Sequence, residues 1–173
     1  MNLLAVSGSL RVGSSNQRLL EALRLSAPPE CNVALRAPLD DLPYFNPDLE
    51  EAGPPAAAAR WRAEVGACDV LVLSSPEYIH GVPGVLKNAL DWLAGGLEMA
   101  EKRVALLNAT PPTEHATASL RETLGVLGAR FVEPACLDFP LRGSKLTPAA
   151  IAADPVLSAR LRAVFEALRA FSV

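Results

Sequence analysis

The residues best suited to chemistry lie near the start of the chain, in the stretch SGSLRVGSSN at residues 7–16. Gly8 and Gly13 have the G-x-x-x-x-G spacing of a Walker-type phosphate loop. A Walker loop continues with lysine and then serine or threonine, whereas Ser14 and Ser15 follow here. The G-x-G-x-x-G dinucleotide pattern is absent as well. The stretch therefore indicates a phosphate ligand, but neither of the two commonest kinds.

Four polar side chains of this stretch have the chemistry to hold one phosphate monoester: Ser9, Arg11, Ser15 and Asn16. A helix starting at this point directs free backbone N–H groups and the positive end of its dipole toward an anion. The hydroxyls and the amide add donors, and the guanidinium adds a charge-assisted contact. The alternative is an ordinary capped turn with a surface arginine.

A second unusual loop, SPEYIHGVPG at residues 75–84, follows directly on an apolar run. Gly81 and Gly84 let the backbone approach a flat ligand closely, and Tyr78 could cover an aromatic face. Backbone N–H groups could bind ring oxygens and nitrogens. The alternative is a rigid connecting loop with an exposed tyrosine, because glycine and proline also simply punctuate structure.

The elements that must position these loops alternate along the chain. Apolar runs predict buried strands at residues 2–6, 32–36, 69–74, 103–107 and 129–132. Helical periodicity predicts helices from residue 14 to the prolines at 28–29, over 56–66 and 83–93, through residues 120–127, and from residue 155 onward. Residues 37–55 are rich in proline and aspartate and are predicted to form one long loop.

Three capping patterns support these helix boundaries. Ser14 and Gln17 form a capping-box pair, and Pro83 occupies the position of a first helical residue. Asp154 followed by Pro155 is typical of an N-cap and a first helical residue.

Alternating strands and helices predict βαβ units and a parallel sheet with helices on both faces, in one domain spanning residues 1–173. Five strands in a chain of this size fit the doubly wound order 2-1-3-4-5. In that order ligands bind beyond the carboxyl ends of strands 1 and 3, because the strand order reverses there. The two unusual loops are therefore expected to border one crevice.

Composition excludes several classes of protein. A formal net charge of −3 gives no reason to expect nucleic-acid or anionic-membrane binding. No apolar run is long enough for a membrane span, and no secretory leader is evident. Cys31, Cys68 and Cys136 show neither a metal spacing nor a disulfide framework, which indicates reduced thiols in the cytoplasm.

His80 and His115 are the two histidines of the chain, and each could donate a proton to a reduced substrate. The alternative is a loop histidine without a chemical role, because neither has a partner recognisable in the sequence. Two histidines and three scattered cysteines do not predict a metal site. No G-x-S-x-G motif surrounds any serine, which disfavours a serine hydrolase.

The pair of motifs GSLRVGSSN and SPEYIHGVPGVLKNALDWL resembles the NADPH-dependent FMN reductase family. The segment DLPYFNPDLE at residues 41–50 resembles the loop that follows the second strand in that family. The family includes quinone, azo-dye and chromate reductases. The resemblance implies a flavodoxin-like three-layer sandwich and non-covalent FMN, with NADPH or NADH as the co-substrate.

The resemblance also implies roles for particular residues. Ser9, Arg11, Ser15 and Asn16 would hold the FMN phosphate, and the isoalloxazine would be lined by Pro76, Glu77, Tyr78, Ile79 and Gly81. No side chain need act as acid or base, since flavin N5 carries the hydride. The acceptor would be a quinone, an azo compound, a metal oxyanion or a flavin. A homodimer or homotetramer is expected, with Trp92 either a contact residue or simply core or helix-edge surface.

One segment departs from the family pattern. After the fourth strand the family usually carries a loop rich in serine and glycine beside the flavin, whereas residues 108–121 contain no glycine. Thr110 and Thr113 could supply hydroxyls, but Pro111 and Pro112 remove backbone donors. Two alternatives therefore stay open: an electron-transfer protein like flavodoxin, and a non-enzymatic module that has lost its flavin.

Overall fold

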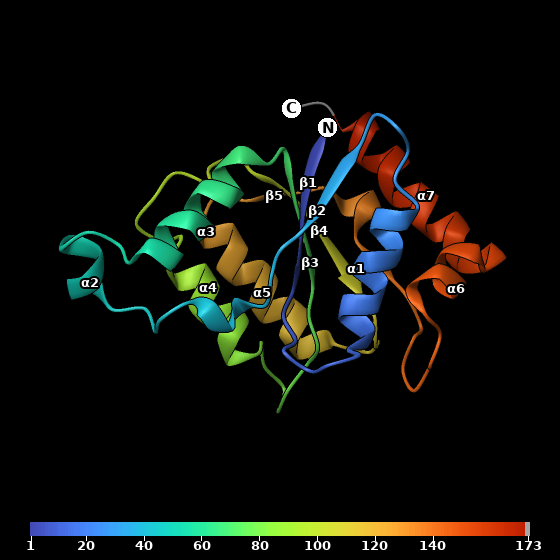
Figure 1. Cartoon of the computed structure of the whole chain (residues 1–173), viewed down its shortest axis with the longest axis horizontal. Helices are drawn as coiled ribbons and strands as arrows, with labels where there is room; N and C mark the ends of the chain where they lie inside the picture. Colours follow the sequence, from blue (N-terminus) through green and yellow to red (C-terminus); the bar gives the residue numbers. More distant parts are fainter. Residues whose placement is uncertain (172–173) are drawn as a thin grey trace.

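Parallel strands in the order β2-β1-β3-β4-β5 form the centre of the computed structural model, which describes residues 1–171 (Figure 1). The strands are β1 (Asn2–Ser7), β2 (Asn32–Leu35), β3 (Val70–Ser74), β4 (Arg103–Asn108) and β5 (Arg130–Phe131). This is the predicted doubly wound order. A short strand that the sequence did not predict, β6 (Leu137–Asp138), pairs in parallel with the end of β4.

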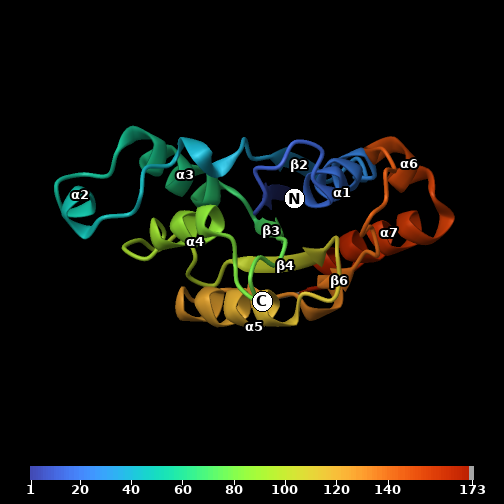
Figure 2. The same ribbon diagram turned by 90° about the horizontal axis from the view of Figure 1, so that it is seen from below.

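Helices cover both faces of the sheet, as Figures 1 and 2 show. One face carries α1 (Ser15–Leu25), α6 (Pro148–Ala153) and α7 (Pro155–Ala170). The other face carries α3 (Ala56–Ala67), α4 (Gly84–Asp91) and α5 (Glu114–Val126). The short helix α2 (Pro47–Glu51) lies away from the sheet, and two 3₁₀ turns are formed by Leu39–Asp41 and Glu133–Ala135.

The two hydrophobic cores explain why the central strands read as continuous apolar runs. In β1, Leu3 and Ala5 pack among the residues of α1 and α7, while Leu4 and Val6 pack among those of α3 and α4. Both faces of the strand are therefore buried, and no polar residue alternates with the apolar ones. The same arrangement holds for β3, whose residues are all buried.

The capping predictions are confirmed in part. Ser14 caps α1 by accepting a hydrogen bond of 3.2 Å from the N–H of Asn16. Gln17 does not complete a capping box, because its amide instead donates to Glu21 across one turn of the helix. Pro83 is the N-cap of α4 and not its first residue. Asp154 caps α7 as predicted, accepting from the first-turn N–H groups.

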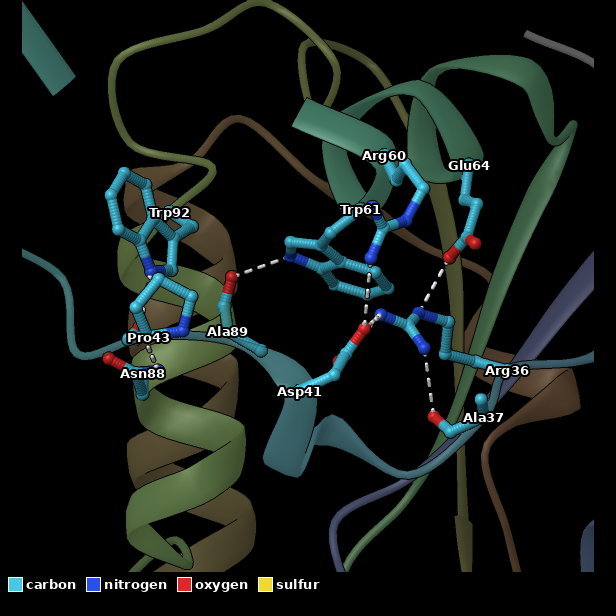
Figure 3. Close-up of polar contacts among 10 residues, drawn as sticks. All are labelled: Arg36, Ala37, Asp41, Pro43, Arg60, Trp61, Glu64, Asn88, Ala89 and Trp92. Carbon is cyan, nitrogen blue, oxygen red and sulfur yellow. Dashed lines mark hydrogen bonds and ion pairs between the residues drawn. The ribbon is translucent and has the colours of Figure 1, made fainter. Parts of the chain in front are cut away.

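The prediction of one long loop over residues 37–55 is wrong, because this segment contains a 3₁₀ turn and α2. Figure 3 shows how its first part is anchored. Arg36 is buried and forms ion pairs with Asp41 at 3.0 Å and with Glu64 of α3 at 2.6 Å. These contacts fix the segment against α3, so that local composition does not decide its structure.

Pro43 and Phe45 of this segment are held by α4 and its end, and Figure 3 shows the contacts of Pro43. The carbonyl oxygen of Pro43 accepts hydrogen bonds from the Asn88 amide at 3.0 Å and from the Trp92 indole at 2.8 Å. Trp92 is fully buried and packs edge-on against Phe45. Of the possibilities left open for Trp92, namely a contact residue, core or helix-edge surface, the structure therefore supports core.

Candidate functional site

The two unusual loops meet at the carboxyl ends of β1 and β3. Ser7 pairs with Ser74, and the N–H of Gly8 donates to the carbonyl oxygen of Ser74 at 2.9 Å. A Cβ atom on Gly8 would lie 2.7 Å from the Ser75 hydroxyl, so this close approach requires glycine. The predicted crevice is confirmed by this juxtaposition.

Between the loops lies an open cavity of about 280 Å³, called here the site cavity. It is lined by Ser9, Arg11, Ser14, Ser15, Asn16, Pro76, Glu77, Tyr78, Thr110, Thr113, Arg142 and Gly143. All four predicted phosphate-binding residues are among them. Of the five predicted ring-binding residues, Pro76, Glu77 and Tyr78 line the cavity, whereas Ile79 and Gly81 do not.

One end of the site cavity gathers hydrogen-bond donors of the kind that suit an anion. Helix α1 begins at Ser15, so its first N–H groups and its positive dipole end lie at this end of the cavity. The Ser9 hydroxyl oxygen accepts from the N–H of Arg11 at 3.3 Å, which leaves the hydroxyl proton free to donate. The Arg11 side chain is exposed and forms no ion pair within residues 1–171.

The side chain of Asn16 is held in place by Ser74, the last residue of β3. Its side-chain oxygen lies 2.9 Å from the hydroxyl of Ser74, and that hydroxyl also lies 2.7 Å from the carbonyl oxygen of Leu107. Ser74 is completely buried and Asn16 nearly so. Because the amide oxygen faces Ser74, the amide nitrogen is the end of Asn16 available to an anion in the cavity.

The other end of the site cavity is shaped by a tight turn. Tyr78 and Gly81 exchange two backbone hydrogen bonds of 3.1 and 3.0 Å. The residues between them, Ile79 and His80, have positive φ angles of 50° and 56°, as in a type I′ turn. The Ile79 side chain is fully exposed at the tip. Ile79 and Gly81 thus form the turn that presents Tyr78.

Glu77 connects this loop to helix α5. Its Oε2 atom accepts a hydrogen bond of 2.9 Å from the N–H of Ala116, in the first turn of α5. The helix needs this partner, because its own N-cap residue Thr113 makes no capping hydrogen bond. The Ala116 N–H, and then the hydrogen bond with His80, hold the pKa of the Glu77 carboxyl below its ordinary value of 4.5.

The two histidines have partners that the sequence did not reveal. His80 Nδ1 lies 3.2 Å from Glu77 Oε1, and the His80 and His115 rings meet edge-on with centroids 4.4 Å apart. The contact between the two rings is not recognisable in the sequence, because His115 precedes Ala116 on α5 while His80 lies in the turn after β3. Neither ring lines the site cavity.

The glycine-free loop after β4, at residues 108–113, contributes to the wall of the site cavity. Thr110 and Thr113 line the cavity, and the Thr113 hydroxyl lies 3.1 Å from that of Thr117. Arg142 and Gly143 line the cavity too, from the turn between β6 and α6, and Arg142 donates to the carbonyl oxygen of Thr110 at 3.1 Å. Sequence reasoning missed this turn; its signal is the basic, glycine-containing stretch LRGSK.

Other kinds of site receive no support from residues 1–171. Their histidine, cysteine and acidic side chains form no cluster of three arranged to hold a metal ion. The three cysteines are free thiols, and burial raises the pKa of Cys68 above its ordinary value of 9.0. No helix in this part of the chain combines the length and apolar character needed to cross a membrane.

Comparison with known proteins gives a consistent result. The model of the NADPH-dependent FMN reductase family matches residues 1–140. An NAD(P)H-dependent FMN reductase of Pseudomonas aeruginosa is 36% identical over 129 residues, which cover 72% of this chain and 69% of that protein. A quinone reductase of Escherichia coli K12 is 35% identical over 95 residues, which cover 54% of this chain and 50% of that protein. The chain thus matches about half the length of the E. coli relative.

Solved structures share the fold. The flavoenzyme NAD(P)H:(acceptor) oxidoreductase FerB from Paracoccus denitrificans superposes with a TM-score of 0.69 at 23% identity, covering 95% of this chain and 97% of that one. An azoreductase from Bacillus anthracis gives a TM-score of 0.63 at 19% identity, with 98% and 99% covered. At these identities the likeness establishes the flavodoxin-like architecture, as predicted.

Proposed function

The chain belongs to the NADPH-dependent FMN reductase family, and from this premise we propose that it reduces bound FMN with NADPH or NADH and then reduces a second acceptor at the same site. The single observation that supports this most directly is the site cavity. In this cavity, hydrogen-bond donors suited to a phosphate lie at the start of α1, and the loop after β3 contributes Tyr78 and the turn that Gly81 closes.

The donors at the cavity fit FMN. Ser9, Arg11, Ser15 and Asn16 supply hydroxyl, guanidinium and amide donors for one phosphate monoester, beside the positive end of the α1 dipole. Among residues 1–171 no lysine lines the site cavity, and its one carboxylate, Glu77, accepts from the Ala116 N–H, which disfavours a metal-bound triphosphate. FMN, when bound, supplies the hydride chemistry at its N5 atom.

The protein residues position the ring and leave it accessible. Pro76, Glu77 and Tyr78 would lie along the isoalloxazine, with Tyr78 half exposed and available to pack on an aromatic face. Ile79 and Gly81 would act by forming the turn that holds Tyr78. Thr110 and Thr113 would replace the usual backbone donors at the ring edge with hydroxyl groups. No side chain is assigned as a catalytic acid or base.

Further parts of the proposal concern acceptor, assembly and location. The open cavity suits a quinone, an azo compound, a metal oxyanion or a flavin as acceptor, since the protein mainly positions the cofactor. Membership of the family favours a homodimer or homotetramer. Three free thiols favour the cytoplasm. We propose that residues 1–173 act as a single domain.

A visible absorption spectrum tests the proposed function. The protein is incubated with FMN, desalted, and then mixed anaerobically with NADPH or NADH. Retained flavin bands that bleach with either nucleotide are the expected result.

Two other results would contradict the proposal. Retained bands that neither nucleotide bleaches would indicate an electron-transfer protein. If no flavin is retained, steady-state turnover is measured with excess FMN. No turnover in that assay would indicate a module without flavin chemistry.

A further inference from the structure

Beside the phosphate end of the site cavity lies a second cavity of about 320 Å³, called here the side cavity. It is lined by Arg11, Gly13, Ser15, Arg18, Gly143, Ser144 and Lys145. Arg11, Ser15 and Gly143 line both cavities. One ligand can therefore extend from the site cavity into the side cavity without leaving the protein surface.

The side cavity is positively charged and has no acidic wall. Arg11, Arg18 and Lys145 line it, Arg142 lies in the adjoining site cavity, and no aspartate or glutamate lines the side cavity. None of these four cations forms an ion pair with a carboxylate in the part of the chain that the structure describes. Other arginines do so, namely Arg36, Arg60, Arg62, Arg121, Arg130 and Arg169.

The wall that carries Lys145 is held firmly against α1. Arg18 donates to the carbonyl oxygens of Ser144 and Leu146, each at 2.8 Å, and to the Ser15 hydroxyl at 3.1 Å. Figure 1 shows the turn between β6 and α6 beside the start of α1. Neutral oxygens accept from both terminal nitrogens of Arg18 and leave its positive charge uncompensated, and its buried Nε has no hydrogen-bond partner within residues 1–171. The side cavity is therefore both ordered and electropositive.

We propose that the side cavity binds a second phosphate group, supplied by a dinucleotide whose other parts occupy the site cavity. The proposal rests on the proposed function, in which Arg11 and Ser15 already face the phosphate of FMN. That phosphate takes up part of the positive charge, and Lys145 and Arg18 remain on the far side of the shared residues. Lys145 is exposed and makes no hydrogen bond within residues 1–171, so its ammonium group is available.

Two dinucleotides can supply this second phosphate. NADPH carries a 2′-phosphate that NADH lacks, so a contact there would make the chain prefer NADPH. FAD continues from the phosphate of its FMN half to an adenylate phosphate, so a contact there would let the chain accept FAD as well as FMN. The group recognised is the same in both cases: a second phosphate in the side cavity, next to the FMN phosphate in the site cavity.

The test compares Lys145→Gln with a matched control, Arg162→Gln, which removes one positive charge from an exposed position on α7. In the first arm, FMN-loaded protein is titrated calorimetrically with NADP⁺ and NAD⁺. In the second arm, flavin-free protein is titrated with FAD and FMN. Loss of one exposed charge-assisted contact should weaken binding by about threefold to tenfold, and high salt should reduce the difference.

The expected result is that Lys145→Gln selectively weakens NADP⁺ in the first arm or FAD in the second, while NAD⁺ and FMN are unaffected. The arm that responds identifies the source of the phosphate. The comparison requires that the wild-type protein retains FMN and oxidises NAD(P)H. The proposal is then overturned if Lys145→Gln changes neither the preference for NADP⁺ over NAD⁺ nor that for FAD over FMN by more than Arg162→Gln does. A wild-type protein that shows no flavin or nucleotide reaction would instead contradict the proposed function.

Discussion

Glu77 caps helix α5 from across the site: its Oε2 atom accepts a 2.9 Å hydrogen bond from the N–H of Ala116. Glu77 lies in the loop after β3, and Ala116 lies in the first turn of α5, which follows the loop after the neighbouring strand β4. The Glu77 carboxylate is thus engaged by the protein, and the loop that presents Tyr78 is tied to the loop that contains Thr113. Movement of one wall of the site cavity is therefore coupled to movement of the other.

We expect Glu77→Ala to loosen the start of α5 and to weaken FMN binding. The carboxylate is the cap that Thr113 does not supply, so hydrogen exchange of the first-turn amides of α5 should accelerate by roughly threefold to tenfold. Hydrogen exchange mass spectrometry over residues 112–120 measures this directly. Glu77→Gln keeps an acceptor oxygen and should restore most of the protection. Equal exchange in all three proteins would show that the hydrogen bond is not formed in solution.

The same carboxylate predicts a pH dependence of stability. Its pKa is lower in the folded protein than the ordinary 4.5, so the folded state favours the charged form. Glu77 therefore stabilises the fold fully above about pH 5, and this contribution is lost as the pH falls through the lowered folded pKa. Urea unfolding of wild type and Glu77→Gln at pH 7, 5 and 3.5 should give a difference that shrinks only at the lowest pH. Glu166→Gln, at an exposed position on α7, is the control.

The main fold could be predicted from sequence because its central strands are buried on both faces. Continuous apolar runs such as those of β1 and β3 indicate strands buried on both faces, because they alternate with amphipathic helices along the chain. The short strand β6 was missed because two residues carry no periodicity, and it exists through pairing with the end of β4. The 3₁₀ turn after β2 was missed because tertiary ion pairs, from the buried Arg36 to the partly exposed Asp41 and Glu64, hold that segment.

In the candidate site, too, some features follow from the sequence pattern and others depend on contacts between distant residues. Its two main loops follow from strand order, because the carboxyl ends of β1 and β3 meet at the switch point. The contacts of Glu77 with Ala116 and of Arg142 with Thr110 join residues 39 and 32 positions apart. No local pattern encodes such pairs in a single sequence. Trp92 was ambiguous for another reason, since helical periodicity alone does not tell core from interface.

Arg11→Ala should weaken FMN binding and leave the fold intact. The side chain is exposed and forms no ion pair within residues 1–171, so its loss should not change the unfolding midpoint. A charged hydrogen bond to phosphate contributes about 1.5–3 kcal/mol, and solvent exposure here favours the lower end, about a tenfold loss of affinity. Fluorescence titration with FMN measures the effect. Wild-type affinity in Arg11→Ala would show that the phosphate assignment is wrong.

Ser74→Ala should weaken FMN binding without removing any group that lines the cavity. Ser74 is completely buried and holds Asn16, so the variant frees the Asn16 amide and leaves the Leu107 carbonyl oxygen without this partner. A destabilisation of about 1–2 kcal/mol is expected together with the loss of affinity. Ser75→Ala is the matched control, because among residues 1–171 this neighbouring buried hydroxyl bonds only to the carbonyl oxygen of Pro76. If both variants bind FMN equally well, Ser74 does not position Asn16.

Ile79→Asn should stabilise the protein, because a β-branched residue is poorly suited to the positive φ of 50° that this turn imposes. Asparagine tolerates the left-handed region, and relief of this conformation should raise the free energy of unfolding by about 1 kcal/mol. Val12→Asn is the matched control: Val12 is also β-branched and almost fully exposed, without a positive φ. Urea unfolding of both variants measures the difference. A stability gain confined to Ile79→Asn, accompanied by weaker turnover, would mean that the exposed isoleucine is kept in an unfavourable conformation for the reaction. No gain in either variant would contradict the turn itself.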